Sequence, residues 1–157
     1  FKTCTSSDCL RVQLNFNHPV LELIWGVRRK CKEEENEYFN YSGMGGADPV
    51  AQVGLNLNNL AKFAPRDGNW FRLVQPYQHH TNIPQSYTYC FSFALNPEDD
   101  QPSGSANFSR IDNVELVLDL QPGMICAQST SATVVVYAVS WNCLRFKSGL
   151  GGLMFAN

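Results

Sequence analysis

The chain has 157 residues, of which 44% are apolar, 12% aromatic and 17% charged. This composition is typical of a packed globular protein, because disordered chains are poorer in apolar residues and richer in charge. The formal net charge of −2 provides no overall positive field, so we expect no direct binding to nucleic acid. No apolar run approaches the about 20 residues of a membrane-spanning helix, so we expect a soluble chain without membrane insertion.

Two strands are predicted on either side of the turn Asn17-His18-Pro19. In residues 11–17 every second side chain is apolar, so one face of the strand meets a core and the other meets water or a neighbour. Apolar residues occupy both faces of residues 21–27, which indicates a strand covered on both sides. The basic and acidic residues of the following segment, residues 28–37, largely cancel in charge, and we interpret this segment as a solvated loop.

Alternation of apolar and polar or smaller residues predicts three more strands, at residues 53–57, 87–95 and 114–120. Between the first two of these, residues 67–77 predict a short helix, with Asp67 as its N-cap and Pro76 limiting its end.

The final apolar run, residues 133–141, predicts either a central strand covered on both sides or one edge of a subunit contact. Turn signals rich in Pro, Gly, Asn and Asp separate the strands. Because helical periodicity is almost absent, the pattern indicates an all-β antiparallel sandwich, with residues 1–157 forming a single domain.

The cysteines have irregular spacings and no CxxC pair, which gives no indication of a structural zinc site. Cys90 and Cys143 lie in strand-like runs, where a free cysteine behaves as a small apolar residue. We therefore expect reduced, mostly buried thiols, with Cys4 and Cys9 as the exceptions. The six cysteines are Cys4, Cys9, Cys31, Cys90, Cys126 and Cys143.

Residues suited to catalysis or metal binding are few. His79 and His80 are adjacent, so on a strand they would point to opposite faces and could not share one metal ion, whereas in a loop they could. Glu98, Asp99 and Asp100 are also consecutive, which favours a solvated turn over a carboxylate pair for glycoside hydrolysis or a calcium site. We expect no catalytic residue, no metal and no cofactor.

Two sequons, at Asn40 and Asn107, are present. A sequon matters only where the chain meets the glycosylation machinery, and short sequons arise by chance, so we expect both to be unmodified. Trp25, Trp70 and Trp141 lie in apolar runs, which favours core packing or a subunit contact over a sugar-binding platform. A carbohydrate-binding module is the alternative function.

The segment FSFALNPEDDQPSGSANFSRID, residues 91–112, resembles the signature stretch of the major capsid proteins of the nucleocytoplasmic large DNA viruses. Four further segments resemble this family in the same order, and the matches together span residues 14–157. They are residues 14–25, 37–43, 66–84 (with the paired histidines) and 144–157.

The resemblance implies an eight-stranded antiparallel jelly roll with a short helix in one loop. Family proteins contain two tandem jelly rolls, and these residues correspond to the second of them. The first jelly roll is absent and the chain begins with Phe1 rather than Met, so we expect a piece of a longer protein.

The resemblance also implies a structural, non-enzymatic protein of an icosahedral virion. Members of the family form homotrimers that act as pseudo-hexagonal capsomers, so the expected partners are two further copies, neighbouring capsomers and minor capsid proteins. Assembly would take place in the host cytoplasm, and any internal membrane would lie beneath the shell.

Within the signature stretch we expect residues near the threefold contact between subunits. The prolines and the glycine would hold a rigid loop, and Arg110 and Asp112 would anchor the following strand by charge-assisted hydrogen bonds. The candidate contact residues are Asn96, Pro97, Gln101, Pro102, Ser103, Gly104, Arg110 and Asp112.

Overall fold

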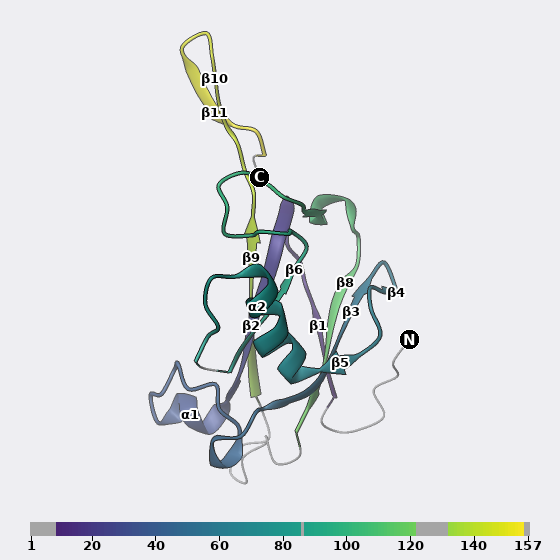
Figure 1. Ribbon diagram of the computed structural model, residues 1–157, viewed down its shortest axis with the longest axis vertical. Coiled ribbons are helices and arrows are strands. Elements are labelled where there is room, and N and C mark those ends of the chain that lie inside the picture. The colour runs from purple at the N-terminus through teal and green to yellow at the C-terminus, as the bar shows by residue number, and fades with distance from the viewer. Residues whose placement is uncertain (1–8, 86, 122–131, 156–157) are drawn as a thin grey trace.

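The computed structural model describes residues 9–85, 87–121 and 132–155. Two antiparallel sheets share one apolar core, and a two-stranded hairpin extends beyond them (Figure 1). The strands are β1 (Cys9–Gln13), β2 (Pro19–Arg29), β3 (Val50–Leu57), β4 (Leu60–Ala61), β5 (Arg66–Asp67), β6 (Thr88–Ser92), β7 (Ala106–Asn107), β8 (Val114–Leu120), β9 (Ala132–Ser140), β10 (Leu144–Lys147) and β11 (Leu150–Leu153). The helical segments are α1 (Lys30–Glu34), η1 (Met44–Gly46), η2 (Trp70–Val74), α2 (Gln75–His79) and η3 (Phe108–Arg110).

The first sheet has the strand order β1-β8-β3-β4, and β5 also pairs with β3. Its register places Leu10 opposite Leu118 and Leu55 opposite Leu116. The predicted alternation is confirmed, because Val53, Leu55, Leu116 and Leu118 are all buried in the core. Each strand therefore contributes one apolar face to the space between the sheets.

The second sheet is built around β2. The strands β6 and β7 pair with β2 antiparallel, and β9 pairs with it along almost its whole length. Residues of β2 such as Trp25 have partners in two strands, Tyr89 in β6 and Val136 in β9. Residues 21–27 are all buried except Ile24, which is half-buried, so the predicted strand covered on both faces is confirmed.

Of the described residues, those that pair with β9 all belong to β2, so the other backbone edge of β9 is unpaired within this part of the chain. Its inward side chains pack against the core, whereas Tyr137 is 61% exposed and Val139 39% exposed. The central-strand interpretation of residues 133–141 does not hold for the described residues. The other interpretation, one edge of a subunit contact, stays a prediction.

The two-sheet arrangement confirms the predicted antiparallel sandwich. The strand number differs from the expected eight, because the described residues form eleven strands, five of which have only two to four residues. Of these short strands, β4, β5 and β7 are pieces of irregular connections that pair with a longer strand, and β10 and β11 pair with each other in the hairpin. Periodicity over so few residues gives little sequence signal.

An aromatic cluster fills the centre of the core. The Trp25 ring lies 6.0 Å from that of Tyr89 and 5.5 Å from that of Phe71, measured between ring centroids. All three side chains are almost completely buried, and the Tyr89 hydroxyl donates a hydrogen bond to Asp48. Truncating a buried aromatic side chain to alanine costs about 3–5 kcal/mol. The cluster thus anchors the helical segment that contains Phe71 on the second sheet, to which both Trp25 and Tyr89 belong.

The predicted helix in residues 67–77 is partly confirmed. Asp67 ends β5, helical residues follow it directly from Gly68, and its carboxylate accepts a hydrogen bond from the Asn69 backbone N–H at 2.8 Å, as the predicted N-cap would. The prediction that Pro76 limits the helix was wrong, because Pro76 lies in the first turn of α2, which continues to His79. Proline is tolerated there because the first turn of a helix needs no backbone donor. Within the described ranges, no helix is long and apolar enough to cross a membrane.

The charged segment after β2 is folded back by ion pairs. Glu33 in α1 accepts from Arg28 at 2.7 Å and from Lys30 at 2.9 Å, and Lys32 lies 2.5 Å from Glu35. These pairs confirm that the charges of the segment cancel. The segment is more than a solvated loop, however, because residues Lys30–Glu34 form the short helix α1.

The cysteine prediction needs correction. Cys9 and Cys31 are disulfide-bonded, whereas Cys90 and Cys143 are free. The expectation of reduced thiols was therefore wrong for Cys31, while Cys9 is one of the two expected exceptions. Disulfide formation depends on Cα atoms coming within about 7 Å in the fold, which the spacing along the chain does not reveal. Cys4 and Cys126 lie outside the described residues.

Candidate assembly surface

The loop between β6 and β7 contains most of the candidate contact residues, and its own hydrogen bonds hold it in shape. The backbone N–H of Asn96 donates to Ser103 Oγ at 2.8 Å, and the Ser103 hydroxyl donates to the Asn96 carbonyl at 3.0 Å. The N–H of Ala94 donates to the Leu21 carbonyl of β2 at 3.2 Å. The structure thus brings Asn96 and Ser103 together at the neck of the loop.

Gly104 closes this loop next to the backbone of β6. Its φ is 154°, and a Cβ there would lie 2.9 Å from the Phe93 carbonyl oxygen. Every other residue type would therefore press a side-chain atom against a backbone atom that has little room to move. The predicted part played by Gly104 in fixing the loop agrees with this geometry.

The remaining candidate contact residues differ in exposure. Pro97 is buried, while Gln101 and Pro102 are exposed at the tip of the loop. Arg110 and Asp112 are exposed as well. Within the described ranges neither side chain makes a hydrogen bond or an ion pair, so the expected anchoring of β8 by Arg110 and Asp112 is not found.

His80 links this loop to the second sheet. Its Nε2 lies 2.9 Å from Oε2 of Glu22 in β2, and its Nδ1 lies 3.3 Å from Oε1 of Glu98 in the loop. The Thr81 backbone N–H also donates to Glu98 at 3.0 Å. The segment after α2 therefore connects a buried strand carboxylate to an exposed loop carboxylate.

Burial dominates the electrostatics of Glu22, which is only 6% exposed. Loss of solvation raises the pKa of Glu22 above its usual value, and the neighbouring His80 acts in the opposite direction. The pKa of Glu98 is lowered: burial opposes the shift, but the hydrogen bonds from the Thr81 N–H and from His80 favour the charged carboxylate. The two carboxylates on either side of His80 thus differ in how readily they take a proton.

The paired histidines have separate partners. The Nδ1 atom of His79 lies 2.8 Å from the Leu95 carbonyl oxygen, and His80 lies between the two glutamates. In the acidic turn, Asp99 accepts a hydrogen bond from the Asn96 side chain at 3.0 Å. In the parts of the chain that the structure describes, no group of three or more His, Cys, Asp or Glu residues is placed to hold a metal ion.

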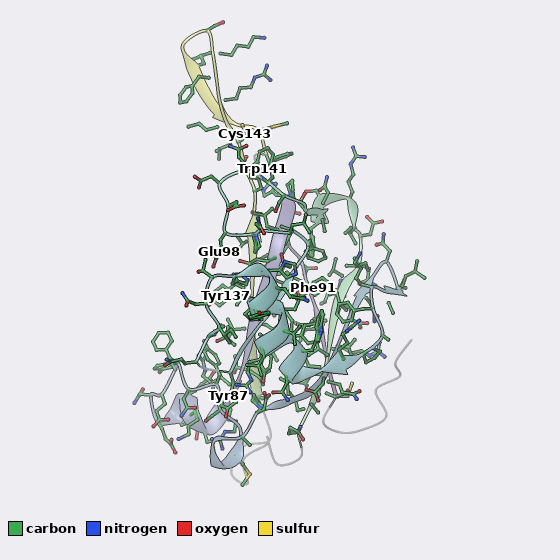
Figure 2. All side chains as sticks on the ribbon, viewed as in Figure 1. Tyr87, Phe91, Glu98, Tyr137, Trp141 and Cys143 are labelled. Atoms are coloured by element: carbon green, nitrogen blue, oxygen red, sulfur yellow. The ribbon has the colours of Figure 1, made fainter. Side chains whose placement is uncertain are left out.

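The C-terminal hairpin of β10 and β11 extends beyond the sandwich (Figure 1), and Figure 2 shows Trp141 and Cys143 at its base. The base is fixed, because the Phe155 N–H donates to Asn142 Oδ1 at 3.1 Å and the Asn142 amide donates back to the Phe155 carbonyl at 2.8 Å. The Trp141 and Phe155 rings also meet edge to face. Beyond this base, all residues of both strands are exposed.

The two sequons differ in their environment. The Asn40 side-chain amide donates to Glu37 at 2.7 Å, and its carbonyl accepts from Ser42. The Asn107 carbonyl oxygen caps η3 by accepting from the Ser109 N–H at 3.1 Å. Whether either asparagine carries sugar stays a prediction.

The exposed aromatic side chains come from different parts of the fold and include Phe39 after α1, Tyr77 in α2 and Phe146 in β10. Of the three tryptophans, Trp25 is buried and the other two are partly buried. No described group of aromatic side chains therefore singles out a sugar-binding platform, which agrees with the preference for core packing.

Two features were missed from the sequence. Glu22 is the sole charged residue within the apolar run of residues 21–27, and that exception was the available signal for a buried ionic contact. The hairpin had a turn signal in Ser148-Gly149, both of which adopt positive φ.

Comparison with known proteins gives one family model, described as large eukaryotic DNA virus major capsid protein, which matches residues 1–152. The major capsid protein of Phaeocystis pouchetii virus is 51% identical over 71% of this chain and 21% of its own length. That of Pyramimonas orientalis virus is 37% identical over 99% of this chain and 41% of its own length.

Solved structures agree. A chain of the PBCV-1 virus capsid matches with a TM-score of 0.77 at 29% identity, over 99% of this chain and 48% of that chain. The Faustovirus major capsid protein, at 12% identity and a TM-score of 0.67, supports the fold alone. The chain spans less than half the length of each of these relatives.

Proposed function

Because the chain belongs to the family of large eukaryotic DNA virus major capsid proteins, we propose that it is a jelly-roll part of a virion shell protein that acts by assembly and not by catalysis. The observation that carries this proposal is the fit of the sandwich, over nearly its whole length, onto less than half of a solved capsid chain. The rest of such a chain has room for a second jelly roll.

The finer proposal is a homotrimer that acts as a pseudo-hexagonal capsomer. A permanent contact of this kind buries roughly 2,000 Å² or more, with an apolar centre. Support comes from the exposed apolar residues of β9 and of the hairpin, which a monomer would leave in water. Neighbouring capsomers and minor capsid proteins would be the further partners, with assembly in the host cytoplasm.

The loop between β6 and β7, together with Arg110 and Asp112 after β7, is the proposed subunit contact. Gln101, Pro102, Arg110 and Asp112 are exposed and available to a neighbour. Asn96, Ser103 and Gly104 shape the loop from within, and the buried Pro97 supports it. In this proposal the inner residues act by positioning the exposed ones.

Native mass spectrometry of the full-length protein tests the proposal. The expected species is a trimer, and Arg110→Ala should lower its population while leaving the thermal unfolding of the monomer unchanged. Lys62→Ala is the control for loss of an exposed cation that lies outside this surface and outside the hairpin. A wild-type protein that stays monomeric at capsid-forming concentrations would contradict the trimer, and an unchanged trimer population in Arg110→Ala would remove Arg110 from the contact. Saturable binding on a glycan array would instead favour the carbohydrate-binding alternative.

A further inference from the structure

The C-terminal hairpin, defined here as residues 144–154, has the surface of a segment that is covered in the working protein. It exposes a series of apolar side chains, with Phe146 74% and Leu150 78% exposed to solvent. A lone two-stranded hairpin is at best marginally stable in water, and contiguous exposed apolar residues mark a contact site. The exposed apolar residues are Leu144, Phe146, Leu150, Leu153 and Met154.

The hairpin is also purely basic. It contains Arg145 and Lys147, and no acidic residue occurs from residue 142 to the C-terminus. In the described part of the chain, neither cation has an ion-pair partner. A surface that covers the apolar side chains should therefore also supply negative charge.

The loop between β6 and β7 has the complementary character. Glu98, Asp99 and Asp100 are all exposed there, and the chain has no Lys or Arg between Arg72 and Arg110. Next to these carboxylates Leu95 is 72% exposed. The loop thus offers an exposed apolar residue beside a cluster of carboxylates, although the hairpin of the same chain makes no described ion pair with it.

We propose that the hairpin of one copy packs on the loop of the next copy, with its apolar side chains against Leu95 and its two cations against Asp99 and Asp100. Each copy carries both halves of this contact, so the contact is head to tail and closes into a ring when the rotation between copies allows it. The proposal rests on the proposed trimeric function and names the surfaces that join its subunits.

A matched pair of variants of the full-length protein tests the apolar part. Phe146→Ser with Leu150→Ser should raise the dissociation constant of the oligomer at least about tenfold, because central interface residues dominate affinity. Leu60→Ser is the control, since Leu60 is 73% exposed in β4, away from both surfaces. Both proteins should unfold at the wild-type temperature as monomers, because the substituted side chains are exposed.

Exchanging the charges of the hairpin and of the loop tests whether the loop of a second copy is the surface that covers the hairpin. Arg145→Glu with Lys147→Glu, and separately Asp99→Lys with Asp100→Lys, should each weaken the oligomer, and the combination of all four should restore it. Carbodiimide cross-linking of an oligomer co-assembled from light and heavy-nitrogen protein should join Lys147 to Asp99 or Asp100 in mixed-isotope peptide pairs, which form only between copies.

The outcomes separate the two proposals. A wild-type protein that never oligomerises overturns the proposed trimer and the inference with it. A wild-type trimer that the Phe146 and Leu150 substitutions leave intact overturns the inference alone. Charge variants whose oligomers are weakened but not restored in combination overturn the assignment to the loop of a second copy and favour the other half of the polypeptide as the surface that covers the hairpin. Cross-links confined to single-isotope pairs also overturn it, because they would mean that the hairpin contacts the loop of its own copy.

Discussion

The imidazole of His80 contacts the carboxylate of Glu22 in β2, with Nε2 and Oε2 2.9 Å apart. Within the described residues neither of these two buried atoms has a hydrogen-bond partner, so the contact is an ion-pair approach rather than an aligned hydrogen bond. A buried carboxylate held in this way gives stability that depends on its protonation state.

The first prediction follows from Glu22. Its raised pKa means that the folded state binds a proton more tightly than the unfolded state does. The stability from this group is therefore complete below the unfolded pKa and is lost as pH rises through the folded value. We expect Glu22→Gln to remove this loss in urea titrations from about pH 4 to 8. The exposed Asp100→Asn is the control, and an equal pH dependence in Glu22→Gln and wild type would refute the prediction.

The second prediction concerns Glu33, and its sign is opposite. Hydrogen bonds from Lys30, then Arg28 and then Thr133, lower the pKa of Glu33 to about 2. Its contribution to stability is therefore present above the unfolded pKa and is lost as pH falls through about 2. Glu33→Gln should lower the melting temperature at neutral pH, and the difference from wild type should vanish in strong acid. The neighbouring exposed Glu34→Gln should change the melting temperature little at either pH, and a Glu33→Gln effect that persists in acid would argue for lost packing instead.

The third prediction is selective thiol chemistry. Burial, with a further effect from the charge of Glu22, raises the pKa of Cys90 to about 12. The thiolate is the reactive form, so iodoacetamide should label the partly exposed Cys143 and leave Cys90 unmodified until the protein is unfolded. Cys9 and Cys31 should become reactive only after reduction. Peptide mass spectrometry reads all four sites, and equal labelling of Cys90 and Cys143 in the folded protein would count against the buried position of Cys90.

The fourth prediction concerns Gly104. A Cβ there would meet the Phe93 carbonyl oxygen at 2.9 Å, so Gly104→Ala should reduce the free energy of unfolding by about 1–3 kcal/mol. Gly54→Ala is the matched control, because its new Cβ would have ordinary contacts, the nearest being Val117 at 3.8 Å. Urea denaturation of the two variants provides the comparison. Similar stability in both would mean that the loop relaxes without cost.

The parts of the fold that follow a short repeat could be predicted from the sequence. Leu116 and Leu118 are buried because alternation along one strand already assigns them to one face. Features that depend on distant partners could not be predicted in the same way. The pairing of β9 with β2, the contact of His80 with Glu22 and the disulfides of Cys9 and Cys31 all require the folded arrangement.

The candidate assembly surface could likewise be predicted from the sequence only in part. The loop between β6 and β7 was identified because its sequence resembles a family signature, and its internal hydrogen bonds agree with a fixed shape. The hairpin also lies in a resembling segment, but its projection from the sandwich depends on the Asn142 and Phe155 contacts at its base. No periodicity marks a pair of strands that is exposed on both faces.

The pairing of early strands with late ones has a consequence for how the chain folds during synthesis. Leu10 in β1 lies opposite Leu118 in β8, and Trp25 in β2 lies opposite Val136 in β9. Folds dominated by such non-local pairs fold slowly, because closing a long loop costs chain entropy before the stabilising contacts form. The apolar faces of β1 and β2 therefore stay exposed in the nascent chain until their partners β8 and β9 have left the ribosome. Over that interval, aggregation and chaperone binding compete with folding.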